Sequence, residues 1–190
     1  MKHPFSQELY AYWNERRGTR VMPDRADIEP RALRRMLGDS FVLAGDAGHG
    51  YPFRLAGTRL CALFGQELRG HAFSSIWDAE STLQIGDVLA VLAAEAVSIT
   101  AGAVAEAGGD LRCNAEMLLL PLAHQGRRGA RMLGLVAPLG RPSWIGMWPA
   151  RSLRLKAIRY LSAVADAVHG RRLSARAALS PKHRSVGPRE

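Results

Sequence analysis

The chain has 190 residues, of which 47% are hydrophobic, and its formal net charge is +9. This length suits one domain with flanking elements, and the hydrophobic content excludes wholesale disorder. No stretch approaches the ~20 apolar residues that cross a bilayer, the N-terminus lacks the apolar stretch of a signal peptide, and 2 cysteines make no disulfide framework. These features predict a cytoplasmic protein.

The positive charge is concentrated near the C-terminus. Residues 1–150 carry 16 Lys and Arg against 15 Asp and Glu, whereas residues 151–190 carry 10 basic and 2 acidic residues. The part of the chain that can form a core is therefore nearly neutral. We do not expect a basic DNA-reading face on the domain itself.

An amphipathic helix is predicted in FSQELYAYWNERRG, where apolar side chains recur at helical spacing and Gly18 can end the helix. Pro23 and Pro30 interrupt the following segment. Pro30 suits the first turn of a short helix that ends at Gly38. We treat residues 1–38 as an N-terminal helical cap.

Two short strands, residues 40–45 and 51–57, are predicted around the turn-rich linker DAGHG, and this pattern favours a hairpin. Strict alternation would place Phe53 and Leu55 on one face of the second strand and Arg54 on the other. The strand meets a short helix within one glycine, Gly57. A sharp turn of this kind can form a wall over the sheet.

The remaining elements complete a core over residues 39–140. Thr58 can cap a short helix, and Asp78 can cap a longer helix over residues 79–96. Three further strands are predicted at residues 97–107, 111–124 and 130–139. Because there is no alternation of strand and helix, a parallel sheet is disfavoured. The order predicts an α+β fold with a five-stranded antiparallel sheet and short helices on one face.

The segment after the core differs in kind. Residues 141–170 are predicted to form a loop with two tryptophans and then an amphipathic helix over residues 152–169, because apolar side chains recur there every three or four positions. Residues 171–190 carry six basic residues against one Glu and contain two prolines. That composition predicts a disordered tail.

The sequence carries no arrangement typical of catalysis or metal binding. His71 and His124 have no neighbouring Cys, Asp or Glu at a metal-ligand spacing. Cys61 and Cys113 are expected to be small buried hydrophobes. No serine is framed as a nucleophile elbow, and GDAGHG is not a dinucleotide-binding loop. Neither an enzyme nor a metal site is predicted.

Several stretches resemble a bacterial PAS family that is often described only as a domain of unknown function. They are YWNERRGTRVMPDRADIEP (12–30), FRLAGTRLCALFGQELRG (53–70), EMLLLPLAH (116–124) and LGLVAPL (133–139), and PSWIGMWPARSLRL (142–155) resembles the tail that follows this family. The resemblance spans about residues 8–160. It implies a sensory and interaction module, with an N-terminal helix of the kind that often pairs at PAS dimer interfaces.

The resemblance also bears on cofactors. Haem-binding PAS domains use a histidine on the long helix, and residues 78–96 contain none. Light-sensing flavin PAS domains use a cysteine in a motif of the Asn-Cys-Arg-Phe-Leu type, whereas Cys61 lies in TRLCALFG. Haem and photoactive flavin are therefore disfavoured. A small apolar or organic ligand, or no ligand at all, remains open.

A pocket between the sheet and the short helices would have a mostly apolar lining with few polar groups. The candidate lining residues are Phe53, Leu55, Cys61, Phe64, Phe73, Trp77 and Met117, with Arg54, Arg59 and Arg112 as polar anchors. The alternative is a filled core without a ligand.

We interpret the chain as a non-enzymatic sensory or regulatory module that acts through dimerisation or a partner protein. The candidate interface is the stripe Phe5, Leu9, Tyr12 and Trp13, with the helix predicted over residues 152–169 as a second surface. The alternative function is electrostatic binding of nucleic acid or an anionic membrane by residues 151–190. The ordinary interpretation of that segment is a solvated tail that aids solubility.

Overall fold

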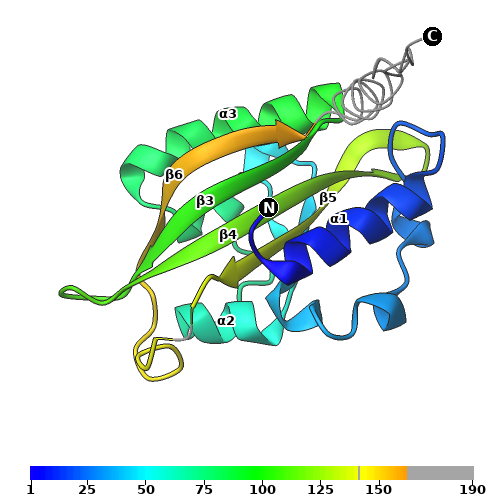
Figure 1. Ribbon diagram of the computed structural model, residues 1–190. Helices are drawn as coiled ribbons and strands as arrows, with labels where there is room; N and C mark the ends of the chain where they lie inside the picture. The colour runs from blue at the N-terminus through cyan, green and yellow to red at the C-terminus, as the bar shows by residue number, and fades with distance from the viewer. Residues whose placement is uncertain (141, 162–190) are drawn as a thin grey trace, which may run out of the picture. The chain divides into compact units, whose positions relative to one another are not determined.

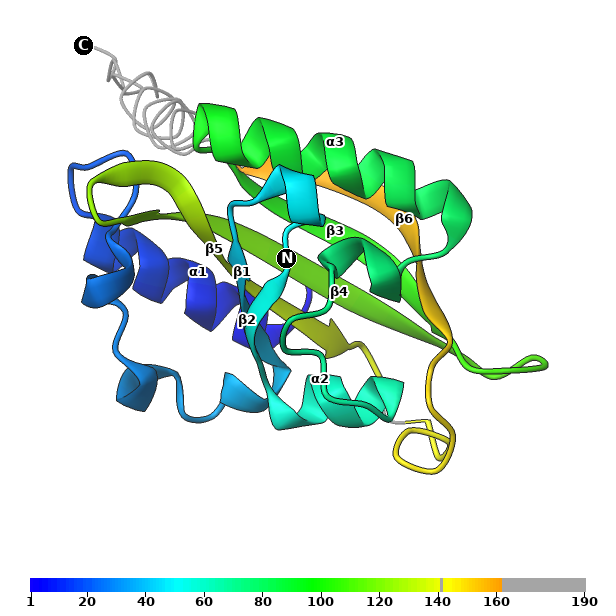
Figure 2. The same cartoon turned by 180° about the vertical axis from the view of Figure 1, so that it is seen from behind.

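The computed structural model describes residues 1–140 and 142–161 (Figures 1 and 2). The helices are α1 (Pro4–Arg17), α2 (Thr58–Phe64) and α3 (Ala79–Glu95). The strands are β1 (Ser40–Ala44), β2 (Phe53–Ala56), β3 (Ser98–Glu106), β4 (Arg112–His124), β5 (Arg127–Pro138) and β6 (Ser152–Leu161). Short 3₁₀ helices lie between them, of which η1 (Arg25–Asp27), η2 (Pro30–Leu33), η3 (Leu37–Asp39) and η5 (Phe73–Ile76) matter below.

The strands form a single sheet in the order β2-β1-β5-β4-β3-β6. The pairs β1–β2, β1–β5, β4–β5 and β3–β4 are antiparallel. The predicted α+β class and antiparallel sheet are therefore confirmed, but the sheet has six strands and the sequence predicted five.

The sixth strand replaces the helix that was predicted after Ser152. Residues 152–161 form β6 at the edge of the sheet, where the N–H of Arg151 donates to the carbonyl of Glu106 at 2.7 Å. Leu153 is buried in the core, and Leu155 and Ile158 pack against it. Pairing with the open edge of β3 outweighs a weak helical periodicity. The rest of the predicted helix and the predicted tail lie outside the described residues.

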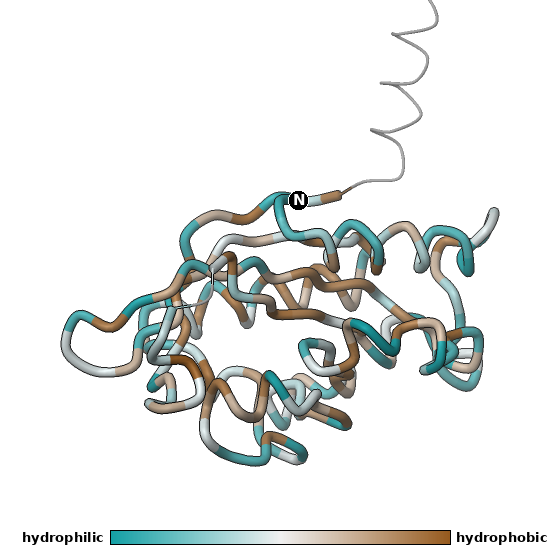
Figure 3. Tube along the Cα trace, turned by 60° about the horizontal axis from the view of Figure 1, so that its bottom comes forward, coloured by the Kyte–Doolittle hydropathy of each residue, from teal (hydrophilic) through white to brown (hydrophobic). Residues whose placement is uncertain are grey.

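Both faces of the central strands of the sheet are covered. The segment from α2 through η5 to α3 covers one face, here called the inner face, and α1 with the segment that follows it covers the other, here called the outer face (Figures 1 and 2). Hydrophobic stretches run along the central strands (Figure 3). In β4, Met117 and Leu119 belong to the inner core, whereas Leu118 and Leu120 are equally buried on the other side. The apolar run in β4 thus serves two layers.

α1 is attached to the outer face by buried side chains and by polar contacts. Leu9 and Trp13 are buried, and the indole N–H of Trp13 donates to the carbonyl of Pro121 at 2.9 Å. The carboxylate of Glu116, a residue only 6% exposed, accepts the N–H groups of Lys2 at 2.6 Å and His3 at 3.0 Å. These two bonds attach the residues directly before α1 to strand β4.

β2 departs from the strict alternation predicted from its sequence. The register shifts between Val42 and Leu43, so that Phe53 pairs with Leu43 while Leu55 pairs with Val42. The prediction that Phe53 and Leu55 share a face is therefore wrong. Leu55 lies with outer-face residues and is 44% exposed, whereas Phe53 is buried in the inner core. A bulge of this kind adds one residue to a strand and re-aims its side chains.

The carboxylate of Glu116 gives the first testable prediction. Burial alone would raise the pKa of Glu116, but the hydrogen bonds that it accepts outweigh burial and lower the pKa. Its contribution to stability is therefore present above the ordinary Glu pKa of about 4.3 and is lost as the pH falls through the lowered pKa. We expect Glu116→Gln to reduce the free energy of unfolding by about 1–3 kcal/mol at neutral pH, because buried donors lose a charged acceptor.

Urea denaturation over a series of pH values measures this effect. The difference between the wild type and the Glu116→Gln variant should shrink as the pH is lowered. Asp87→Asn, which changes an exposed carboxylate in the middle of α3, is the matched control and should have little effect at any pH. A difference at Glu116 that does not vary with pH would contradict the proposed role of its charge.

Candidate functional site

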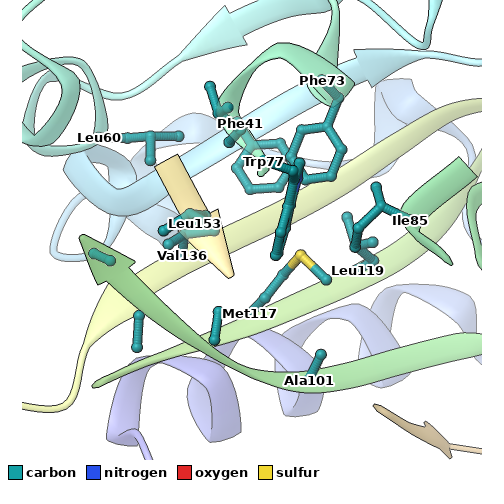
Figure 4. Packing of buried hydrophobic residues seen from close by; sticks show 14 of the residues in the cluster. Phe41, Leu60, Phe73, Trp77, Ile85, Ala101, Met117, Leu119, Val136 and Leu153 are labelled. Atoms are coloured by element: carbon teal, nitrogen blue, oxygen red, sulfur yellow. The ribbon is translucent and has the colours of Figure 1, made fainter. Parts of the chain in front are cut away.

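Four aromatic rings fill the space between the inner face and the helices that cover it. They belong to Phe41 in β1, Phe53 in β2, Phe73 in η5 and Trp77 directly after η5, and we call them the aromatic cluster (Figure 4). Neighbouring ring centroids are 5.3 to 5.8 Å apart, in edge-on and stacked arrangements. Such pairs contribute about 0.5–1.5 kcal/mol each beyond the area that they bury.

The local fold positions these rings by backbone hydrogen bonds between β2 and the segment before η5. The N–H of Phe53 donates to the carbonyl of His71 at 2.9 Å, and the N–H of Gly70 donates to the carbonyl of Phe53 at 2.8 Å. The N–H of Phe73 donates to the carbonyl of Gly50 at 3.0 Å. The chain therefore returns alongside β2 and delivers Phe73 directly onto Phe53.

The same segment continues to β6. Trp77 forms a parallel bridge with Leu153, and the N–H of Asp78 donates to the carbonyl of Leu153 at 2.9 Å. Two residues further along β6, the N–H of Leu155 donates to the hydroxyl of Ser81, in the first turn of α3, at 2.8 Å. β6 is thus held between β3 on one side and the start of α3 on the other, and Trp77 lies at the junction.

Trp77 also carries a polar group without a partner. Its side chain is almost fully buried, and its indole N–H has no hydrogen-bond acceptor among the described residues. Buried indole N–H groups usually find an acceptor, and leaving one unpaired costs about 1–3 kcal/mol. The group is a donor enclosed in an otherwise apolar layer, in which it lies with Phe73 and Met117 (Figure 4).

The predicted pocket residues separate into two groups. The structure brings the apolar members Phe53, Phe64, Phe73, Trp77 and Met117 together in the inner core, and it places Cys61 half-buried on α2 beside them. Phe41, which the sequence analysis did not name, completes the aromatic cluster because β1 lies next to β2 in the sheet. The signal in the sequence was an aromatic residue within the apolar run of the first predicted strand.

The other predicted members do not face the aromatic cluster. Arg54 and Leu55 are both exposed, and for Leu55 this results from the bulge in β2. Arg112 is exposed at the start of β4 and lies 3.7 Å from the carboxylate of Glu106. Arg59 lies on the polar side of α2, because the apolar stripe of that helix turns Leu60 and its neighbours toward the sheet.

Arg59 instead forms an ion pair that the sequence analysis missed. Its Nε and Nη2 donate to the two carboxylate oxygens of Asp39 at 2.9 and 2.6 Å, and Nη2 also donates to the carbonyl of Arg35 at 3.0 Å. The Asp39 side chain is 8% exposed and that of Arg59 is 55% exposed. The hydrogen bond to Asp39 raises the pKa of Arg59. A lone arginine on the polar side of an apolar helix was the available signal.

The sharp turn into α2 depends on Gly57. A Cβ atom at this position would overlap the carbonyl oxygens of Leu37 and Gly38. The backbone of the turn therefore lies directly on η3, and this close approach places Arg59 within reach of Asp39. A groove of about 470 Å³ opens beside the pair, and Phe5, Leu60, Leu63, Val136 and Ile145 are among its lining residues. None of the four rings of the aromatic cluster lines it.

The PAS domain family matches the chain over residues 1–137. The chain belongs to the PAS domain family. The resemblance found in the sequence is therefore confirmed, and the protein has the fold of a sensory module.

Similar solved structures include the LOV protein of Rhodobacter sphaeroides, at 12% identity and a TM-score of 0.45 over 61% of this chain and 71% of that one. The PAS domain of BvgS from Bordetella pertussis matches at 12% identity and a TM-score of 0.42, over 76% of this chain and 98% of that one. A third structure is the PAS domain of a LuxR-family transcriptional regulator from Burkholderia thailandensis, in complex with ethanol. It matches at 14% identity and a TM-score of 0.41, over 59% of this chain and 98% of that one. Likenesses this distant carry no argument about function. No curated protein matches the chain.

The titratable groups of this PAS domain give little basis for chemistry. Burial raises the pKa of both the Cys61 and the Cys113 thiol, so neither is ionised at neutral pH. No group of three or more His, Cys, Asp or Glu in the described part of the chain is arranged to hold a metal ion. Of the helices described, none is long and apolar enough to cross a membrane.

The packing of the aromatic cluster gives a second prediction. Gly134 in β5 lies opposite Phe41 in β1, and a Cβ atom at position 134 would overlap the Phe41 ring. We expect Gly134→Ala to lower the free energy of unfolding by about 1–3 kcal/mol through overpacking, measured by urea denaturation. Gly86→Ala is the matched control, because Gly86 lies within α3 with open space around it. That variant should gain up to about 1 kcal/mol. Equal effects of the two substitutions would contradict the packing.

Proposed function

We propose that this PAS domain is a non-enzymatic regulatory module in which a change at the aromatic cluster is relayed to β6 and from there to another protein molecule. The observation that supports the proposal is the hydrogen-bonded junction at Trp77. One side of this residue packs against Phe73, and its backbone bridges to Leu153 of β6. Any displacement of the ring therefore acts on the edge strand.

The segment between α2 and α3 is the element best suited to move. It contains one short 3₁₀ helix, η5, and is attached to the sheet by a few hydrogen bonds, whereas β3, β4 and β5 are joined along most of their lengths. Segments with few backbone bonds open at a lower free energy than long ladders. A signal needs an element with two arrangements that input and output both bias, and the stretch from Phe73 to Ser81 meets that need.

The unpaired indole N–H of Trp77 supports a small ligand as the input. A molecule with an apolar body and one hydrogen-bond acceptor would satisfy this donor, and the adjoining rings would have to shift to admit it. The ordinary alternative is a core that stays filled and responds only to a protein partner. Native mass spectrometry of the purified protein distinguishes the two, since a ligand adds a defined mass.

The proposal assigns no catalytic step. Asp39 and Arg59 satisfy each other as an ion pair, and burial raises the pKa of the Cys61 thiol and of the Tyr51 hydroxyl, which belongs to the inner core. The alternative of electrostatic binding by residues 151–190 is tested only in part by the described residues. Arg154 of β6 donates to Glu106 at 2.7 Å, and most of that extension lies outside the described residues.

The surface that contacts another protein molecule, here called the output surface, is inferred from the apolar side chains that are not buried within the chain. In the stripe predicted as an interface, Leu9 and Trp13 are buried against the outer face of their own sheet, which leaves Phe5 and Tyr12 partly exposed. Pairing through the whole stripe would require α1 to leave the sheet. We therefore place the proposed contact on β6, where Tyr160 is 51% exposed.

Hydrogen exchange tests the relay. We expect Trp77→Ala to speed exchange of the Leu155 amide and its neighbours in β6 more than exchange in β4, because the junction at Leu153 loses its support. Leu9→Ala is the control, since it removes a buried side chain of the outer face at a cost of about 2–5 kcal/mol. Trp77→Phe removes the indole N–H but keeps an aromatic ring, and it should give a smaller effect of the same pattern.

The relay is wrong if both alanine variants speed exchange in β6 and β4 in the same proportion. In that case the change follows global stability alone. Exchange is read peptide by peptide by mass spectrometry, at a denaturant concentration at which every variant remains folded.

Light scattering of the full chain tests the output surface separately. We expect a dimer that Tyr160→Glu weakens about tenfold or more, because a carboxylate would then be buried in the contact. Leu83→Glu, at a 76% exposed position on α3, is the matched control and should leave the dimer unchanged. A strictly monomeric wild type, or equal effects of the two variants, would contradict a homodimer through β6.

A further inference from the structure

Four arginines gather at the end of the sheet formed by the β4–β5 hairpin. They are Arg25 in η1, Arg54 in β2, and Arg127 and Arg131 in β5, and we call them the arginine cluster. They come from three segments that are far apart in the sequence. Figures 1 and 2 both show the segment after α1 lying beside this hairpin.

The strand register explains how the segments meet. Arg131 lies opposite Leu122 of β4 and opposite Ala44 of β1. A parallel bridge between Asp24 and Ala123, with a hydrogen bond of 3.0 Å from Ala123 to Pro23, brings η1 against the same stretch of β4. Arg54 comes from the neighbouring β2, where the bulge leaves it exposed.

No carboxylate in the described part of the chain forms an ion pair with any of these four side chains. Arg25 donates to the carbonyl of Ile28 and Arg131 to that of Ala130, and neither acceptor carries a formal charge. By contrast, the nearby Arg20 lies 2.8 Å from the carboxylate of Asp27. The cluster therefore concentrates positive charge that the surrounding side chains do not neutralise.

This concentration has a free-energy cost. Burial lowers the pKa of Arg131, and the charges of Arg54, Arg127 and Arg25 lower it further. Like charges held close together disfavour the charged form, and an anion that binds among them removes the penalty. A guanidinium presents a planar fork of N–H donors that matches the oxygens of a phosphate or a carboxylate.

A small apolar slot adjoins the cluster. It measures about 50 Å³ and is bordered by Arg25. Its apolar lining includes Ile28, Leu33, Val42, Leu55, Leu122 and Leu133. A slot of this size admits a few carbon atoms, and because Leu55 is half-exposed, the slot is reached from the surface.

We propose that the arginine cluster binds the phosphate group of a soluble small molecule whose adjoining carbon atoms enter the slot. A phosphate offers more charge and more acceptor oxygens than a single carboxylate, which suits four guanidinium groups converging from different segments. Phe41 also borders the slot, so the site adjoins the aromatic cluster, but anion binding does not require the relay through β6.

Titration of the full chain with pyrophosphate and with inorganic phosphate tests the site, by calorimetry and by the rise in Tm at constant ionic strength. We expect saturable binding of pyrophosphate to the wild type. Arg131→Gln and Arg54→Gln should each weaken it about 10- to 100-fold, because each removes charged hydrogen bonds to the anion. Arg69→Gln, at an exposed position after α2, is the control and should bind like the wild type.

A second readout separates an anion site from a structural role of Arg131. Without phosphate and at low ionic strength, Arg131→Gln should have a Tm equal to or above that of the wild type, because it relieves repulsion within the cluster. A lower Tm in that buffer would overturn the proposal. So would unchanged pyrophosphate binding by Arg131→Gln, acetate binding as tight as phosphate, or binding to phosphatidate vesicles in place of pyrophosphate.

Discussion

The structure depends on one constraint, which is that both faces of the central strands of a twisted six-stranded sheet must be buried. Strands β4 and β5 lie in the middle of that sheet and are apolar on both sides, so neither face can be left to water. The short helices and α3 cover one face, and α1 with the segment after it covers the other. The buried carboxylate of Glu116 and the indole of Trp13 make this second layer specific, because each pairs with backbone groups that would otherwise be unsatisfied.

This constraint limits where the protein can respond to a signal and where it can contact a partner. α1 already serves the outer face, so its apolar stripe is largely occupied within the chain. The central strands are fixed by long ladders on both sides. The parts that remain free to change are the short segment around η5 and the edge strand β6, and Trp77 joins them. This is the physical basis for the proposal that a signal passes through the junction at Trp77.

Sequence patterns predicted the elements whose spacing is set locally. α1, α3 and the central strands follow from periodicity, and Phe53, Phe73 and Trp77 were placed between sheet and helices from the order of elements alone. Strand β6 could not be predicted in the same way. Leu153, Leu155 and Ile158 fit a helix and a strand about equally well, and the choice is made by the open edge of β3, some fifty residues earlier in the chain.

The polar part of the site was harder to predict, and the reason is again physical. The bulge in β2 depends on how β1 and β2 register, which no alternation within β2 reveals, and it moved Leu55 away from the pocket that it was expected to line. The pair of Asp39 and Arg59 depends on the close approach that Gly57 permits between two turns. Distances between side chains on different elements are set by tertiary packing, so residue type and spacing cannot give them.

The bulge in β2 also links the two sites argued above. Phe53 belongs to the aromatic cluster and Arg54, the next residue, belongs to the arginine cluster. An anion held by Arg54 would restrain the backbone that positions the Phe53 ring, and displacement of that ring would in turn move the guanidinium. Thermodynamic linkage requires such an effect to be reciprocal, so any ligand of the inner core that shifts Phe53 must change the affinity for the anion by the same factor that the anion changes affinity for the ligand. A strand of four residues with one side chain in each site is short enough to carry this coupling without any change in the central strands.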